Sequence, residues 1–344
     1  MKIRAFIYSG LCSCCLWAAG CSNEVSDADA EAQVTFYLTT RAAEDSGTPV
    51  AITDKQFTRL LLAERMPEHT TVDGKEELHC ALSSRYDITG GRYQLEGLFG
   101  QWYKFAFVCV PAVNEMQGGR LFQARNVADT PVEHDFNKLM VDYAPVLKYQ
   151  ADSLKKAQGE DLAVYRKIID LWIDPVNPST EDVTLTRVTG ELILDMGIPA
   201  DQFEKPVRSI TLNIPEAVVR LYIHDNTVDD VLTESEDGTA TRSFEWTLDP
   251  DDPVEQNSRL VFKIALLPGE LSPQGGFVIV SFNDNSVQSF KLQNDNNAPI
   301  LIKKNIRTKV LFNGMYSNEF EIRYAGFDDN AEIDVPGDDW NGWH

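Results

Sequence analysis

The sequence predicts a mainly β protein with two tandem β-sandwich domains and a small helical segment in the first. Apolar and polar residues alternate over short stretches throughout the second half of the chain, as they do at 260–266. Many such strands, separated by turn residues, are typical of β-sandwiches. The 344 residues are enough for about two domains of roughly 150 residues each.

The chain begins with the features of a bacterial lipoprotein signal peptide. A short basic start precedes an apolar run that ends at Trp17, and two small residues stand directly before Cys21. We therefore expect residues 1–20 to be removed and Cys21 to carry acyl chains that hold the protein on a membrane. The alternative is an ordinary signal peptide that happens to end at a cysteine.

The mature chain is strongly acidic. Removing residues 1–20, which include Lys2 and Arg4 and no acidic residue, leaves 29 basic against 53 acidic residues and changes the net charge from −22 to −24. An acidic surface repels phosphate backbones, so we expect no nucleic-acid partner. No later stretch approaches the ~20 continuous apolar residues that a membrane-spanning helix needs.

The first half of the mature chain contains a tether, four strands and two expected helices. Residues 21–32 are small, polar and acidic, which indicates a tether before a first domain at 33–178. The expected strands are 33–40, 57–63, 93–98 and 102–110. Apolar residues then recur at helical spacing, so helices are expected near 136–173, at 136–147 and 162–172.

Residues 175–182 interrupt every periodicity with two prolines and several turn-forming residues, so we place the domain boundary there. The second domain then covers 183–344 and is almost entirely strand and turn. A hairpin turn is expected at Asn283-Asp284-Asn285. The expected strands are 184–196, 210–214, 219–223, 244–248, 260–266, 277–282, 287–292, 307–312 and 319–325.

Two cysteines remain in the folded part, because three leave with the signal peptide and Cys21 carries the lipid. In an oxidising compartment, Cys80 and Cys109 could form a disulfide. Cys109, however, lies in a run that indicates a buried strand, where a free thiol is equally suited. The sequence leaves both readings open.

The sequence offers no catalytic residues, no cofactor and no metal site, so we expect a non-enzymatic protein. None of its five histidines pairs with another at metal-ligand spacing, and the mature chain contains no nucleophile or phosphate-binding motif. Asn/Asp-rich loops at 225–230, 294–297 and 328–330 could supply oxygen ligands to calcium. Turn chemistry explains the same residues, and we favour it.

Three stretches resemble the fimbrillin and fimbrial-anchor (FimB-type) lipoproteins of Bacteroidales: 34–42 (VTFYLTTRA), 101–111 (QWYKFAFVCVP) and 185–195 (LTRVTGELILD). The resemblance spans nearly the whole mature chain and rests on layout and strand character more than on an invariant motif. It implies two transthyretin-like β-sandwich domains and a surface-exposed protein lipidated at the outer membrane through Cys21. It also implies assembly with other fimbrial subunits by donor-strand exchange, in which a strand from one subunit completes the sheet of the next.

The resemblance also implies proteolytic maturation, because polymerising subunits of that family lose their first strand after a basic residue. Arg41, followed by Ala42, stands at that position, at the end of a strand expected at the N-terminal edge of the first domain. The alternative is that the strand is retained, as an anchor subunit would require. The competing function is a glycan-binding surface lipoprotein, with Trp340 and Trp343 as candidate contacts to a host or bacterial surface ligand.

Overall fold

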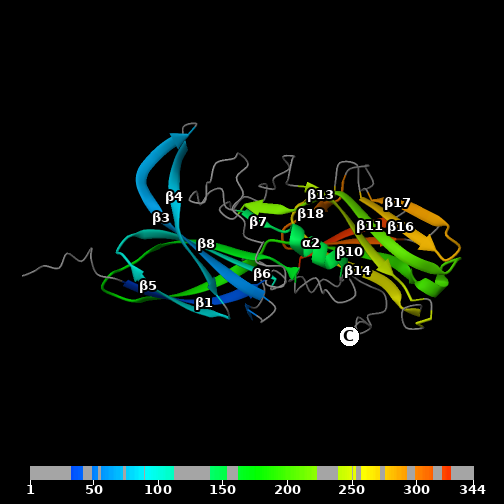
Figure 1. Ribbon diagram of the computed structural model, residues 1–344, viewed down its shortest axis with the longest axis horizontal. Helices are drawn as coiled ribbons and strands as arrows, with labels where there is room; N and C mark the ends of the chain where they lie inside the picture. Colours follow the sequence, from blue (N-terminus) through cyan, green and yellow to red (C-terminus); the bar gives the residue numbers. More distant parts are fainter. Residues whose placement is uncertain are drawn as a thin grey trace, which may run out of the picture.

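In the computed structural model, two groups of β-strands follow one another along the long axis of the molecule (Figure 1). We call them the N-terminal β unit (β1–β6, β8 and β9) and the C-terminal β unit (β10, β11 and β13–β20). The structure describes residues 32–41, 49–52, 56–72, 75–88, 90–111, 140–152, 162–222, 239–249, 251–252, 257–271, 276–292, 299–312 and 320–326.

The N-terminal β unit is one eight-stranded sheet in the order β2-β1-β9-β8-β6-β3-β4, with β5 also paired to β1. Its strands are β1 (Ala32–Arg41), β2 (Val50–Ala51), β3 (Gln56–Val72), β4 (Lys75–Ile88), β5 (Arg92–Leu98), β6 (Trp102–Pro111), β8 (Tyr165–Trp172) and β9 (Ser179–Arg187). The ring centroid of Phe36 on β1 lies 5.1 Å from that of Phe105 and 5.0 Å from that of Phe107, both on β6. The sheet therefore folds over on itself, and β1 faces β6 across a buried core.

The C-terminal β unit is a sandwich of two four-stranded sheets. One has the order β14-β10-β19-β20: β14 (Arg259–Leu266), β10 (Gly190–Pro199), β19 (Ile306–Phe312) and β20 (Phe320–Gly326). The other has the order β13-β11-β16-β17: β13 (Thr239–Thr247), β11 (Val207–Val218), β16 (Gly276–Phe282) and β17 (Val287–Leu292). Ring contacts join the two sheets, with centroids 4.2 Å apart for Trp246–Phe262 and 5.4 Å apart for Phe290–Phe312. The predicted mainly β sandwich class is confirmed.

Smaller elements complete this unit. The 3-10 helix η5 (Ala200–Gln202) follows β10, and β15 (Gly269–Glu270) pairs with β18 (Leu301–Ile302). The predicted hairpin turn joins β16 to β17, with Asn285 in the left-handed conformation at φ 65°. Such a conformation is tolerated best by glycine and asparagine, which explains the residue type at this position.

A segment from the first half of the chain packs on the C-terminal β unit. The strand β7 (Met140–Asp142) pairs with β12 (Arg220–Tyr222), and the helix α2 (Ala144–Asp152) packs against β13 and β14. Gln150 of α2 accepts a hydrogen bond from the backbone N–H of Ala265 and donates one to its carbonyl, both at 2.9 Å. Because Ala265 lies on the edge strand β14, this side-chain amide stands where another strand would pair. The helix therefore closes one side of the sandwich.

The expected helix at 162–172 is wrong, because residues 165–172 form β8. Tyr165, Ile169 and Leu171 pack on one core cluster, whereas Ile168 packs on the other. A strand with apolar residues on both faces can reproduce helical spacing, and its β-branched isoleucines favour a strand. The other expected helix, at 136–147, is wrong as placed, because Met140–Asp142 form β7 and the helix α2 covers 144–152, so that the two ranges overlap only at 144–147. Pro145 lies in the first turn of α2, where its missing N–H costs nothing.

The chain passes from one β unit to the other at Val188-Thr189, between β9 and β10. The stretch 184–196, expected to be one strand, is therefore two strands in different sheets. The crossing is tight, since a Cβ added at Gly190 would lie 2.5 Å from the carbonyl oxygen of Lys303. The division into domains at 33–178 and 183–344 stays a prediction, and a cut intended to separate the sheets belongs after β9.

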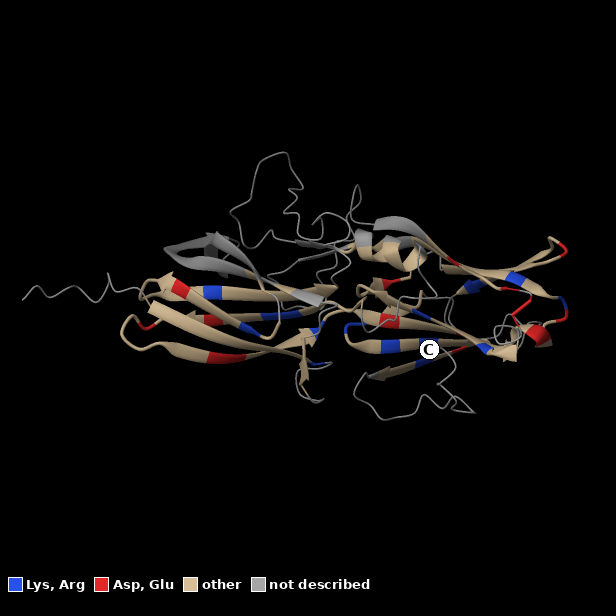
Figure 2. Cartoon of the chain, turned by 60° about the horizontal axis from the view of Figure 1, so that its bottom comes forward, with Lys and Arg blue, Asp and Glu red and all other residues tan. Residues whose placement is uncertain are grey.

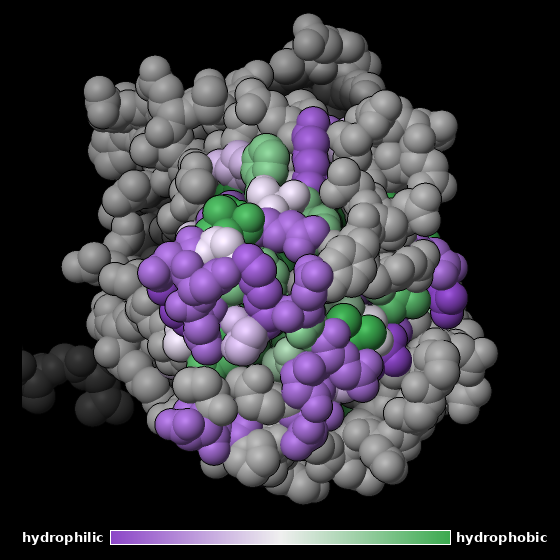
Figure 3. Space-filling model, turned by 90° about the vertical axis from the view of Figure 1, so that its right-hand side faces the viewer, coloured by the Kyte–Doolittle hydropathy of each residue, from purple (hydrophilic) through white to green (hydrophobic). Residues whose placement is uncertain are grey.

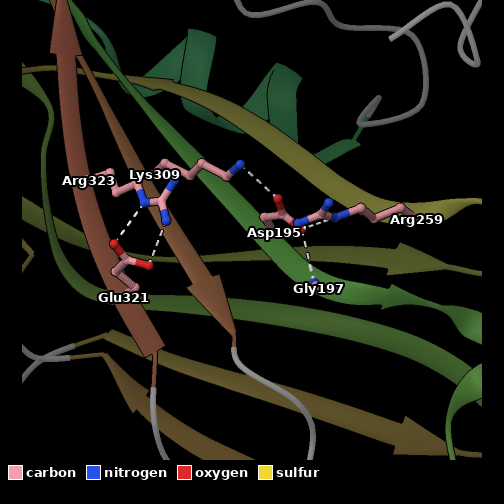
Figure 4. Close-up of polar contacts among 6 residues, drawn as sticks. All are labelled: Asp195, Gly197, Arg259, Lys309, Glu321 and Arg323. Carbon is pink, nitrogen blue, oxygen red and sulfur yellow. Dashed lines mark hydrogen bonds and ion pairs between the residues drawn. The ribbon is translucent and has the colours of Figure 1, made fainter. Parts of the chain in front are cut away.

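A charged cluster is buried on the side of β10 and β19 that faces away from the sandwich core (Figure 4). The Asp195 carboxylate lies 3.0 Å from the Nζ of Lys309 and 2.8 Å from the Nε of Arg259, and it accepts a hydrogen bond from the N–H of Gly197 at 3.0 Å. Asp195 and Lys309 are almost completely buried, so each charge depends on its partner.

Candidate functional site

The candidate site is the position that β1 occupies in the N-terminal β unit, between β5 and β9 and over Phe105 and Phe107. We call this position the seat of β1. Residues of β1 alternate in burial as the sequence predicts: Val34, Phe36 and Leu38 are buried, whereas Tyr37 is 43% exposed. The Phe36 ring meets Phe105 edge-on or tilted, as it does Phe107, an arrangement that aromatic pairs prefer. β1 therefore supplies one wall of the core of this unit.

β1 has partner strands on both sides. It runs parallel to β9, in register from Val34–Ser179 to Arg41–Thr186, and on its other side it pairs antiparallel with β5 and then β2. The expected position of this strand at an edge is wrong, because alternation reports which face is buried and not which strands lie alongside. The two flanking strands are the functional feature that the sequence reasoning missed.

Removal of β1 would leave a defined vacancy. β5 and β9 would each lose a row of backbone hydrogen bonds, and the Phe105 and Phe107 rings would lose the Phe36 side chain that covers them. Each buried apolar side chain contributes about 1.5–3 kcal/mol, so any strand with the same alternation is favoured to fill the gap. β1 is the first described element of the chain, so one cut after it detaches it from the rest of the fold.

Arg41 is the last residue of β1 and pairs with Thr186 of β9. Its side chain is half-buried, and its Nε makes no hydrogen bond. A protease that cuts after Arg41 must therefore first release this residue from the end of the β1–β9 ladder. Cys21 and Ala42 lie outside the described residues.

Cys109 is buried on β6 and is a free thiol. Burial raises its pKa to about 12. On β3, Thr58 pairs with Cys109, whereas Arg65 pairs with Cys80. Those two β3 residues are about 23 Å apart at roughly 3.3 Å per residue. A disulfide needs Cα atoms within about 7 Å, so the two cysteines do not pair.

The remaining expectations concern residues elsewhere. The loops 225–230, 294–297 and 328–330, together with Trp340 and Trp343, lie outside the described residues. In the part of the chain that the structure describes, no group of three or more His, Cys, Asp or Glu residues is placed to hold a metal ion. No helix in that part is long and apolar enough to cross a membrane. Figure 2 shows acidic and basic residues interspersed on the strands of both units.

Comparison with known proteins gives similar structures but no sequence match. No protein-family model matches the chain, and no curated protein matches it. The chain is similar to the tip fimbrial protein Mfa3 from Porphyromonas gingivalis, at 9% identity over 86% of this chain and 98% of that one, with a TM-score of 0.44. It is also similar to a fimbrial assembly protein from Parabacteroides distasonis, at 12% identity over 87% and 97% of the two chains, with a TM-score of 0.41.

Proposed function

We propose that this chain is a non-enzymatic fimbrial subunit, an anchor or minor component, held on the outer membrane by acyl chains on Cys21 and joined to other subunits by β-strand addition. One observation supports the proposal most directly. β1 lies between two ladders and covers aromatic core residues, yet it comes before every other described element. Such a strand can be exchanged for one from another chain without changing the path of the rest.

The position of the cut creates two forms of the protein. Cys21 precedes β1, and β1 ends at Arg41, so cleavage after Arg41 separates the lipid and the strand from the rest of the chain. In our proposal, the cut chain has an open seat that accepts a donor strand. The uncut chain stays on the membrane with its seat filled by its own β1, and it joins its neighbours by donating a strand.

Strand exchange at the seat is tested on the folded mature chain, with a specific protease site placed directly after Arg41. After cutting, a fluorescent peptide with the sequence of residues 32–41 is added, and its binding is followed by anisotropy and gel filtration. We expect the labelled peptide to displace the cut β1 and to remain with the protein.

Two peptide variants form a matched pair for this test. A Phe36→Asp peptide places a charge against Phe105 and Phe107 and should not bind, whereas a Tyr37→Asp peptide places it on the exposed face and should bind. Equal behaviour of the two variants, or no exchange with the native peptide, would contradict the strand-acceptor role.

Membrane attachment is tested separately, by fatty-acid labelling of cells that produce the protein. The native chain should incorporate the label and the Cys21→Ser chain should not, because no other cysteine follows two small residues at the end of an apolar run. Equal labelling of the two chains would refute lipidation at Cys21 and leave the strand-exchange result unaffected.

A further inference from the structure

The N-terminal β unit ends in a cluster of exposed apolar side chains. Phe99 is 51% exposed, Trp102 43%, Trp172 48% and Val176 65%. They lie at the start of β6, the end of β8 and the two neighbouring loops, β5–β6 and β8–β9. These elements meet at the left end of the molecule in Figure 1. We call this cluster of four residues the aromatic pole.

The aromatic pole is held in a fixed shape. Trp102 and Trp172 are directly paired across β6 and β8, with ring centroids 6.0 Å apart and planes at 65°. The two loops touch, since a Cβ added at Gly100 would lie 2.9 Å from Cδ of Pro175. Two exposed indoles are costly to leave in water, and here they are preorganised for a contact.

A turn around Asp174 also fixes Val176 at the tip of the β8–β9 loop. The Asp174 carboxylate accepts hydrogen bonds from the Val176 N–H at 2.8 Å and from the Asn177 side chain at 2.8 Å. These hydrogen bonds, with that of Asn177 the strongest, lower the pKa of Asp174, so the turn persists at neutral pH. Val176 is therefore presented outward without a large loss of chain entropy on contact.

The opposite end of the molecule has the contrary character. Figure 3 faces that end and shows mainly hydrophilic residues among those described. There Lys205 donates a hydrogen bond to Asp284 at 2.8 Å, and Arg208 donates one to Asn285 at 3.0 Å. Among the described residues at that end, Val287 is the large apolar residue that is exposed, at 65%. The two ends therefore suit different surroundings, one apolar and one aqueous.

The aromatic pole is also the end at which the chain enters the fold. Ala32, the first residue of β1, pairs with Leu98 directly before Phe99. Cys21 is eleven residues earlier, and a chain of that length spans at most about 40 Å. A lipid on Cys21 thus keeps the aromatic pole, and not the hydrophilic end, close to the bilayer surface.

We propose that the aromatic pole docks into the polar interface of the membrane that holds the acyl chains, so that the protein stands upright on a lipid surface. Trp side chains prefer this interface because the ring is apolar and its N–H finds a polar partner. The proposal rests on the lipidation of Cys21 under the proposed function. The net charge of the chain favours zwitterionic over anionic lipid.

A carbohydrate is the other occupant that exposed Trp side chains suggest. The planes of Trp102 and Trp172 meet at 65°, so the two rings share no flat face on which a sugar ring could stack. An interfacial contact has no such requirement, since each indole enters the lipid independently. The geometry therefore favours the membrane, and a soluble glycan becomes one outcome of the test.

The test attaches the mature chain to vesicles chemically, so that it does not depend on natural lipidation. The chain from Cys21 carries Cys80→Ser and is coupled through the Cys21 thiol to a maleimide lipid in phosphatidylcholine vesicles; buried Cys109 does not compete. Trp340 and Trp343 are replaced by Phe. Brominated phosphatidylcholine, which quenches nearby indoles, should reduce the emission of Trp102 and Trp172 but not that of buried Trp246.

Two valines of equal exposure supply a matched control, because Val176 and Val287 are each 65% exposed at opposite ends. Val176→Ser combined with Phe99→Ser should reduce quenching, and Val287→Ser should leave it unchanged. Vesicles with anionic lipid should give less quenching than zwitterionic ones.

Three results would overturn the proposal. The first is emission that is the same with brominated and plain lipid, although the chain is attached. The second is quenching that Phe99→Ser with Val176→Ser does not alter. The third is an emission change caused by soluble bacterial polysaccharide without lipid, which would assign the aromatic pole to a glycan. Because the tether is chemical, none of these results depends on whether cells lipidate Cys21.

Discussion

The two β units close their cores with different kinds of element. In the N-terminal unit the closing element is β1, a strand at the beginning of the fold that lies between β5 and β9. In the C-terminal unit it is α2, which is held between β7 and the rest of the chain and covers the β13 and β14 edges. The difference teaches that a single cut frees the closing strand of one core from the rest of the fold's chain, whereas the closing helix of the other has described elements on both sides of it in the sequence.

The contacts of each closing element suit its role. β1 is held by regular backbone ladders and an alternating apolar face, which any strand of similar pattern can reproduce. α2 is held by specific side chains: Gln150 bonds to Ala265, and Tyr143, the residue directly before the helix, donates a hydrogen bond from its hydroxyl to the Leu162 carbonyl at 2.7 Å. Burial raises the pKa of Tyr143 far above its usual value, so the hydroxyl stays a donor. The backbone ladders of β1 can therefore be formed by a strand from another chain, whereas the side-chain hydrogen bonds at α2 require these particular residues.

The largest loss of stability is expected from a substitution in β1, the strand that closes the core of the N-terminal unit. Phe36→Ala removes a fully buried ring that contacts Phe105 and Phe107, and should lower the free energy of unfolding by about 3–5 kcal/mol. Urea unfolding followed by circular dichroism measures the change. Tyr37→Ala, on the exposed face of the same strand, is the control and should cost much less. Similar losses for both variants would mean that β1 does not cover the core as described.

The next largest loss of stability is expected from removing one of the buried charges in the C-terminal unit. Lys309→Met removes one partner of Asp195, which keeps Arg259, and should destabilise the protein by about 2–4 kcal/mol. Adding Asp195→Leu should recover part of this loss, because the remaining buried charge disappears. Denaturant unfolding of both variants checks this, and a double variant less stable than Lys309→Met would argue against an uncompensated charge.

A smaller effect weakens the helix closure. Gln150→Ala leaves the N–H and carbonyl of Ala265 without their side-chain partner in a buried place, at an expected cost of about 1–3 kcal/mol. Gln94→Ala is the matched control, since that glutamine donates an exposed hydrogen bond to Glu96 and its loss should be nearly neutral. Thermal unfolding compares the two. Equal shifts in melting temperature would show that α2 is not held through Gln150.

The smallest effect concerns a turn that closes neither core. Hydrogen bonds from Lys205 and Ser286 lower the pKa of Asp284 well below its usual range. A pKa lower in the folded than in the unfolded chain stabilises the fold at pH above about 3.9, and this stabilisation is lost as the pH falls through the folded pKa. Lys205→Met should raise the pKa of Asp284, as measured by NMR titration. An unchanged pKa would mean that the lysine is not its main partner.

The sequence predicted the burial pattern of single strands well, because that pattern is local. Val34, Phe36 and Leu38 alternate with polar residues, and the structure buries them. It did not reveal that β5 and β9 flank β1, since pairing between residues 34 and 179 leaves no mark at either position. The prediction of a helix at β8 was wrong for a related reason. Ile168 and Ile169 pack on different cores, so both faces of this strand carry apolar residues, and their combined spacing resembles that of a helix. Trp102 and Trp172 were likewise invisible as an exposed pair, because only their cross-strand register brings them together.

The direction of β1 sets the polarity of any filament built through its seat. β1 is parallel to β9 and antiparallel to β5, so a replacement that restores both ladders must run from the aromatic pole toward the C-terminal unit. If every subunit accepts its neighbour's strand in that one direction, each contact joins two different surfaces. Contacts of this head-to-tail kind propagate without closing unless the rotation between subunits forms a ring. The growing end and the membrane end of such a filament would then be chemically distinct from its first contact onward.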